Sequence, residues 1–291
     1  MKLRRLMMFF SICFIGLTLC GCSNNKQEYN PQSDFEFNNG VLVKYIGNSN
    51  SVIIPSTYID SFNKVVDVKV IGDSAFKENF FIETVKLPNS IESIEDNAFN
   101  YCFNLVDIKF NDGLKSIGAS SFERCISLEK ISIPDSVSEV KEHAFDSCIS
   151  LKKVKLSKGI DTISAYTFSK CLSLKKITIP DNVIHIGEYA FQDCQSLKRI
   201  KIPNTVKDVG EGCFRNCVKL KKAVMSKKVE AIYKYTFESC FALKKVKNTK
   251  QIEFVGRYAF KNCLKLRYIE FSYSADVADN AFANCPVADI Y

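Results

Sequence analysis

The chain is poor in histidine, the side chain most often used as a metal ligand and as a general acid or base. It has no tryptophan, and its only histidines are His143 and His185. The two histidines fall at different positions of the repeat described below, so no zinc site follows from them. Catalysis needs a nonrepeating group of acid, base or nucleophile in a pocket, whereas Ser, His and Asp here occupy repeat positions or are scattered. We therefore expect no enzymatic activity, no cofactor and no metal site.

Long apolar runs are missing except near the N-terminus. Three basic residues, Lys2, Arg4 and Arg5, precede a largely apolar run of 14 residues over 6–19. This run is short for a membrane span and typical of a signal peptide. The following Leu-Cys-Gly-Cys-Ser over 19–23 resembles a bacterial lipobox, although Cys20 stands where Ala, Ser or Thr is commoner. We predict a signal peptide over 1–21 and a lipid on Cys22, with ordinary secretion without lipid as the alternative.

Two segments separate this leader from the regular part of the chain. Residues 22–34 are polar, with little to bury, and are predicted to be a flexible tether. Residues 35–74 have strand character, for example at 41–43 and 52–55, but do not follow the later period. Terminal repeats are expected to be atypical because they cover the first coil. We predict that residues 35–74 form an N-terminal cap.

A 23-residue pattern repeats over residues 75–291. Phenylalanine recurs at 76, 99, 122, 145, 168, 191, 214, 237 and 260, and cysteine at 102, 125, 148, 171, 194, 217, 240 and 263. Phe282 and Cys285 follow after a step of 22. A unit of this size cannot bury its own apolar face, so it must stack on its neighbours. The period therefore predicts a solenoid or a related repeat array.

Each repeat contains a strand-like spacing of apolar residues. Leu174, Ile177 and Ile179 show it, and their final alternation is typical of a half-buried strand. The full unit, A-F-x-x-C-x-S-L-x-x-I-x-I-P-x-x-V-x-x-I, resembles the BspA-like class of leucine-rich repeats from about residue 35 onward. The resemblance implies a right-handed coil with a parallel sheet on one side, a binding role and no catalytic residue.

The predicted fold is thus a leucine-rich repeat solenoid of about ten coils. It has a parallel β-sheet on one side and short strands and single helical turns on the other. Strands about 4.8 Å apart make this a rod on the order of 50 Å long. Phe145, Cys148 and Ile149 lie at i, i+3 and i+4, so one helical turn would place them on one face. We expect all of the repeated apolar columns to pack in the core.

Ten cysteines remain after the three at positions 13, 20 and 22. An exported chain with so many cysteines normally suggests disulfides. Here the cysteines of successive coils stand in register, so their side chains point the same way rather than at each other. We predict buried free thiols, with disulfides or a metal as alternatives. Cys213 and Cys217 are close in sequence, but Cys213 stands where other repeats have a small residue such as Ala190.

Positive charge gathers on the predicted strands. The formal charge is +8, and removal of the three basic leader residues leaves +5. The residues that project from the outer face of the strands are strongly basic, and we name the following set the basic strip: Lys130, Lys153, Lys155, Lys176, Arg199, Lys201, Lys222 and Lys245. The strip is either a solvated face that keeps the sheet soluble or a surface that attracts an acidic partner.

These features predict a lipid-anchored protein of the bacterial cell surface or membrane. Its expected role is adhesin-like binding of an extracellular protein or an acidic glycan through the strand face. The export signal and the lack of an interleaved aromatic row argue against nucleic acid. The alternative is a structural or self-associating envelope protein, because the chain ends inside an expected strand near Ile290 and leaves a sheet edge open. Such an edge could make a homo-oligomer.

Overall fold

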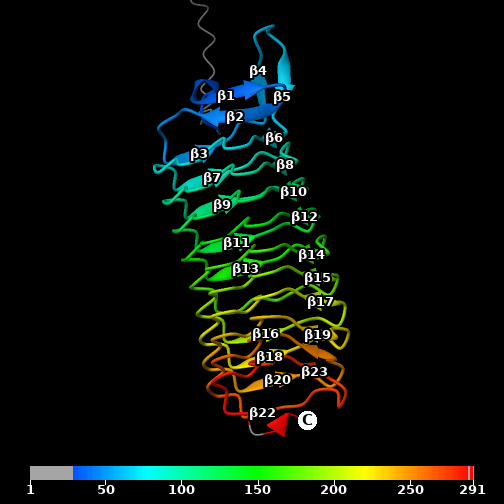
Figure 1. Cartoon of the computed structure of the whole chain (residues 1–291). Helices are drawn as coiled ribbons and strands as arrows, with labels where there is room; N and C mark the ends of the chain where they lie inside the picture. Colours follow the sequence, from blue (N-terminus) through cyan, green and yellow to red (C-terminus); the bar gives the residue numbers. More distant parts are fainter. Residues whose placement is uncertain (1–28, 288, 291) are drawn as a thin grey trace, which may run out of the picture.

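A computed structural model describes residues 29–287 and 289–290, which form a solenoid of about nine turns. Two columns of short strands run the length of the solenoid, and the chain descends from the N-terminal cap to the last coil (Figure 1). The predicted leucine-rich repeat solenoid is confirmed. The signal peptide, the lipidation residue Cys22 and most of the predicted tether lie outside the described residues.

One column carries the strands that the Leu-x-x-Ile-x-Ile spacing predicts, and we call its outer surface the strand face. Its members are β3 (Ser51–Ile53), β7 (Thr84–Lys86), β9 (Asp107–Lys109), β11 (Lys130–Ser132), β13 (Lys153–Lys155), β16 (Arg199–Lys201), β18 (Lys222–Val224), β20 (Lys245–Lys247), β22 (Tyr268–Ile269) and β24 (Asp289–Ile290). These strands pair in parallel within four groups, which are β3–β7–β9, β11–β13, β16–β18–β20 and β22–β24.

The second column consists mainly of two-residue strands. Its members are β6 (Val70–Ile71), β8 (Ser93–Ile94), β10 (Ser116–Ile117), β12 (Glu139–Val140), β14 (Thr162–Ile163), β15 (His185–Ile186), β17 (Asp208–Val209), β19 (Ala231–Ile232), β21 (Phe254–Val255) and β23 (Asp276–Val277). The second residue of each strand is buried, except the half-buried Val277 of β23, and the chain then turns into the Phe-containing segment.

The segments that carry Phe and Cys form turns that are not helical, so the prediction of single helical turns was wrong. The only helix among the described residues is the 3-10 helix η1 (Gln32–Asp34). In each turn, backbone amides donate to the next coil, as Phe145 N does to Thr167 O (3.0 Å) and Ser147 N to Ser169 O (2.8 Å). Ser147 accordingly adopts a left-handed φ of 59°, which ends any helical path. The amides thus alternate between inter-coil bonds and local turn bonds, such as Cys148 N to Phe145 O (3.3 Å), and do not continue as a helix.

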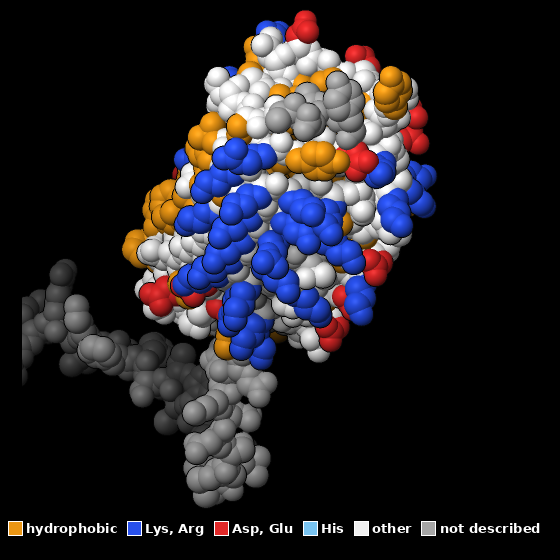
Figure 2. All heavy atoms as spheres, turned by 90° about the horizontal axis from the view of Figure 1, so that it is seen from below, with side chains coloured by type: hydrophobic (Ala, Val, Ile, Leu, Met, Phe, Trp, Pro, Cys, Tyr) orange, Lys and Arg blue, Asp and Glu red, His pale blue; other side chains and the backbone are white. Residues whose placement is uncertain are grey.

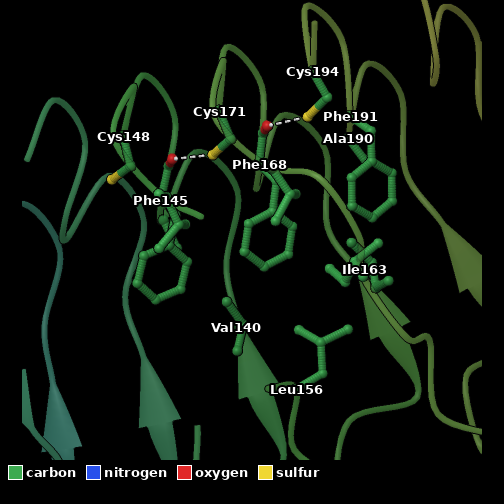
Figure 3. Close-up of a cluster of buried hydrophobic side chains, with 14 of the residues drawn as sticks. Val140, Phe145, Cys148, Leu156, Ile163, Phe168, Cys171, Ala190, Phe191 and Cys194 are labelled. Carbon is green, nitrogen blue, oxygen red and sulfur yellow. Dashed lines mark hydrogen bonds between the residues drawn. The ribbon is translucent and has the colours of Figure 1, made fainter. Parts of the chain in front are cut away.

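The core consists of ladders of identical side chains. The rings of the repeated Phe residues stack from Phe76 to Phe282, with centroids 4.7–5.7 Å apart and interplanar angles of 3–14°. Tyr45 of the cap stacks on Phe76 at 5.2 Å and so begins this ladder. Figure 3 shows Phe145, Phe168 and Phe191 as successive rungs beside the buried aliphatic residues.

The cysteine column forms a second ladder, in which each thiol donates to a backbone carbonyl. Cys171 Sγ donates to Phe145 O at 3.4 Å and Cys194 Sγ to Phe168 O at 3.3 Å (Figure 3). All ten cysteines of the described chain are free, and all but Cys285 are buried. This confirms the predicted buried thiols. Cys213 is also buried and takes the place of a small residue.

The cap combines antiparallel and parallel pairing. β1 (Phe35–Asn38) pairs antiparallel with β2 (Val41–Tyr45), and β2 pairs in parallel with β6 of the first coil. β3 continues the strand face because it pairs with β7. The hairpin of β4 (Thr57–Ile59) and β5 (Val65–Asp67) lies outside both columns and projects at the N-terminal end (Figure 1).

Candidate partner-binding surface

The structure brings the basic strip together on the strand face. Lys130 pairs in register with Lys153, and Arg199, Lys222 and Lys245 follow one another on β16, β18 and β20. The aliphatic residue between the two outward positions of each strand, such as Ile200 in β16, points into the core. All members of the strip are exposed except Lys222, which is half-buried. Figure 2 shows rows of Lys and Arg side chains on the face seen from below.

Among residues 29–287 and 289–290, acidic partners of the strip are present only at its N-terminal start. Lys130 Nζ lies 3.5 Å from the carboxylate of Asp107, its neighbour on β9. Nearby, Lys152 pairs with Glu129, and this contact lowers the pKa of the Glu129 carboxyl through a hydrogen bond and direct attraction. From Lys153 to Lys245, no strip residue has a carboxylate within 4.0 Å in the part of the chain that the structure describes. Their charge is therefore available to a partner.

The hydrogen-bond ladder of the strand face opens at residues 176–178. These residues belong to no strand, although their sequence follows the repeat, and they lie between β13 and β16. In the described chain, no amide from Lys175 to Ile179 donates to the preceding coil, whereas Lys152 N donates to Glu129 O (2.8 Å). The ladder is likewise interrupted between β9 and β11 and between β20 and β22, but only at residues 176–178 of the described strand face is the strand itself missing.

A groove of about 1380 Å³ lies over this opened coil and the two coils after it. Its floor includes Ile177, Ile179 and Pro203, and Asp181 is the only acid along it. Seven basic residues line it: Lys158, Lys175, Lys176, Lys198, Arg199, Lys201 and Lys222. The groove is thus a positively charged concavity with an apolar floor, which suits an extended anionic chain.

Sequence analysis did not predict a partly exposed row of apolar residues, which we call the apolar ridge and which consists of the apolar residues that follow the ladder cysteines. The residue after each ladder cysteine was expected in the core, but Ile149, Phe241 and Leu264 are 38%, 41% and 54% exposed. A residue with left-handed φ precedes each ladder cysteine, and after this turn the cysteine points inward while the residue that follows it is partly exposed. The recurrence of Phe, Ile, Leu or Val at this position could have revealed the ridge. A partner on the strand face would meet apolar surface at its edge.

The cysteine ladder does not provide reactive thiols at this surface. Burial raises the pKa of Cys102 to about 12, and burial raises the pKa of Cys171 and Cys217 well above the ordinary range. Cys285 is the least buried, and its pKa is raised to about 11. Nucleophilic chemistry requires the thiolate, so these side chains serve packing and hydrogen bonding.

The two histidines lie apart on the surface of the solenoid. His143 stacks on Tyr166 with centroids 4.5 Å apart, and His185 Nδ1 lies 2.5 Å from the carboxylate of Asp208. Within residues 29–287 and 289–290, no three His, Cys, Asp or Glu side chains are grouped so as to hold a metal ion. The described part of the chain also has no helix with the length and apolar character needed to cross a membrane.

Comparison with solved structures shows the same fold in two bacterial proteins. A leucine-rich cell surface protein from Faecalibacterium prausnitzii has a TM-score of 0.64 and 23% identity, covering 92% of this chain and 89% of that chain. The pneumococcal vaccine antigen PcpA has a TM-score of 0.58 and 20% identity, covering 81% of this chain and 70% of that chain. At these identities the likeness concerns the fold.

Comparison of the sequence alone gives the family. No curated protein is significantly similar to the chain. The family described as "BspA type Leucine rich repeat region" matches residues 69–183 and 161–288, with six copies. Because these matches together span most of the chain and coincide with the regular coils, the protein belongs to the family of BspA-type leucine-rich repeat proteins.

Proposed function

We propose that this protein is exported, anchored through a lipid on Cys22, and binds an acidic macromolecule through its strand face. The partner is an acidic glycan or an acidic patch of an extracellular protein, so the role is adhesin-like and not enzymatic. The observation that carries the proposal is the groove between residues 158 and 224, which seven basic residues and a single acid line. The structurally similar Faecalibacterium protein is a cell surface protein, which supports the location.

The electrostatics of the strip favour binding over stability as its role. Like charges that stand about 4.8 Å apart repel each other, by roughly 1 kcal/mol per pair in water and less with salt. From Lys153 onward this repulsion is not relieved by acids in the described chain. An anionic partner would relieve it at several coils at once, and attraction along the strip would speed its association.

Self-association through the last coil is the second candidate. β24 pairs with β22 on one side, and it supplies the terminal strand of the described strand face. A strand in that position can pair with another chain. Sedimentation analysis tests this function, and a strictly monomeric protein would remove its support.

The test of the first function is binding of the processed protein to immobilised sulfated or sialylated glycans and acidic matrix proteins. A variant with Lys153, Lys176, Arg199 and Lys222 changed to Glu removes the charge of the groove. The matched control changes four exposed lysines elsewhere to Glu, which are Lys77, Lys170, Lys207 and Lys228. Both variants have the same net charge.

We expect the strip variant to lose roughly tenfold or more in affinity, and binding by the unmodified protein to weaken with salt. The control variant should keep most of its binding. An equal loss of affinity in both variants would mean that net charge alone, and not the strand face, causes the binding. Unchanged binding by the strip variant would move the binding site away from the strand face.

A further inference from the structure

The hairpin of β4 and β5 presents three large apolar side chains to solvent. Ile59, Phe62 and Val65 are 55%, 88% and 64% exposed. Phe62 lies in the turn, and Ile59 pairs directly with Val65 across the hairpin, so these two side chains share its outer face. The solenoid buries nearly all of its repeated Phe residues, whereas these three side chains expose apolar surface together on one hairpin at its N-terminal end (Figure 1).

The inner face of the hairpin is packed against the cap. The ring of Tyr58 stacks on Phe37 with centroids 4.6 Å apart, and Tyr58 Oη accepts a hydrogen bond from Gly40 N at 3.2 Å. Val66, opposite Tyr58 in the pairing, is half-buried. The hairpin is therefore held in position, and its outer face cannot turn inward without breaking these contacts.

The turn at the tip is also fixed by hydrogen bonds. Asp60 Oδ1 accepts from Phe62 N and from Lys64 N, both at 2.9 Å, and Asp60 N donates to Lys64 O at 2.9 Å. Asn63 supplies the left-handed φ of 58° that the turn requires. The exposed Phe62 is thus presented on a preorganised turn, with the cation of Lys64 two residues away.

The chain enters the solenoid at this same hairpin. The side-chain amide of Gln32 makes two hydrogen bonds to the backbone of Ile59, at 2.8 and 2.9 Å. Asn30 is joined to Ile53 by two hydrogen bonds, at 2.9 and 2.8 Å. Tyr29 stands seven positions after Cys22, and a fully extended chain over seven positions spans at most about 25 Å. A lipid on Cys22 would therefore hold the hairpin close to the membrane surface.

We propose that the tip of the β4–β5 hairpin inserts into the interfacial layer of the membrane that carries the lipid of Cys22. This inference rests on the lipid anchor of the proposed function. Phe62, Ile59 and Val65 would enter the boundary between headgroups and acyl chains, and Lys64 would contact lipid phosphates. With the lipid and the tip as two contacts, the solenoid stands away from the membrane and leaves its strand face accessible.

A membrane fits this tip better than a second copy of the chain does. A stable protein interface buries about 800 Å² on each partner, which three side chains on a projecting turn do not supply. A groove of about 920 Å³ lies beside the hairpin and is lined by Phe37, Tyr58 and Phe62, but Val65 on the outer face does not line it. A membrane already tethered nearby needs no such area, because the lipid has brought the two surfaces together.

The absence of tryptophan from the sequence allows a direct test. The lipidated protein carries Phe62→Trp as its only tryptophan and is reconstituted into vesicles of phosphatidylethanolamine and phosphatidylglycerol. The matched control is Tyr273→Trp, since Tyr273 is 99% exposed near the other end of the solenoid. Flotation measures anchoring, while the tryptophan emission and its quenching by brominated lipids measure insertion. Circular dichroism checks that both variants are folded.

We expect the Phe62→Trp emission to shift to shorter wavelength and to be quenched, and the Tyr273→Trp emission to do neither. A floating protein with unquenched Phe62→Trp emission would overturn the insertion and leave the anchor standing. Quenching of both reporters would also overturn it, because the solenoid would then lie along the membrane. A protein that does not float would overturn the anchor itself and with it this inference. A shift that depends on protein concentration without vesicles would indicate self-association instead.

Discussion

The phenylalanine ladder inside the solenoid and the basic strip on its strand face share one 23-residue period but differ in their energetics. Both place like side chains in register in successive coils. In the interior, each ring buries apolar surface against its neighbours, which stabilises the fold. On the strand face, the neighbouring cations repel each other. The period therefore determines which residues align, whereas burial determines whether the alignment stabilises the protein.

The largest expected effect is the response of the interior to alkaline pH. Nine buried thiols have raised pKa values, so the folded state keeps their protons while unfolded thiols ionise. Their stabilisation is complete below the unfolded thiol pKa, about 8.5 to 9, and is lost as pH rises toward the folded values. Each thiol contributes about 1.4 kcal/mol per pH unit in that window.

We therefore expect the free energy of unfolding to fall steeply above about pH 9, as measured by urea denaturation at a series of pH values. A variant with Cys148→Ala and Cys171→Ala should show a shallower slope, by about 2.8 kcal/mol per pH unit, whatever its stability at neutral pH. An unchanged slope in this variant would mean that the thiols do not control alkaline unfolding.

The next effect distinguishes the phenylalanine ladder from the basic strip by one substitution in each. Phe168→Ala should lower the free energy of unfolding by about 3–5 kcal/mol, because it leaves a cavity between two stacked rings. Lys176→Ala on the exposed strip should change it by less than about 0.5 kcal/mol. Chemical denaturation of both variants tests the contrast. Equal effects would show that the strip takes part in stabilising the solenoid.

A smaller effect of opposite sign is expected from charge reversal on the strip. Lys176→Glu places a carboxylate between Lys153 and Arg199, so it should raise the free energy of unfolding by roughly 0.2–1 kcal/mol. The gain should shrink at high salt, because these charges are exposed. The matched control, Lys207→Glu, stands beside Asp208 and should give no gain. Destabilisation by Lys176→Glu would contradict the view that the strip is repulsive.

The smallest difference concerns thiol accessibility in the folded protein. Cys285 is half-buried, whereas the other described cysteines are buried. We expect a coloured thiol reagent at neutral pH to modify Cys285 slowly and the ladder thiols only on unfolding. Cys285→Ser should abolish the slow phase. Fast modification of several thiols in the native protein would show that the cysteine ladder opens to solvent.

Much of the candidate site follows from the sequence because the period carries it. Once Lys153, Lys176 and Arg199 share a repeat position, parallel stacking must bring them to one face, and the register of the strand pairs around them confirms this. The turns were harder to predict. The spacing of Phe145, Cys148 and Ile149 suits a helical turn equally well. The helix is excluded only because backbone amides of this segment donate hydrogen bonds to carbonyls of the next coil.

The sequence by itself determined the solenoid, the buried ladders and the alignment of the basic strip, since each depends on which residues recur every 23 positions. The tertiary structure alone decided the opened coil at residues 176–178, the exposure of Ile149 and the projection of Phe62 from the cap. These features depend on how neighbouring coils share hydrogen bonds and where a non-repeating hairpin packs. Such contacts join residues that are distant in sequence, so no local pattern records them.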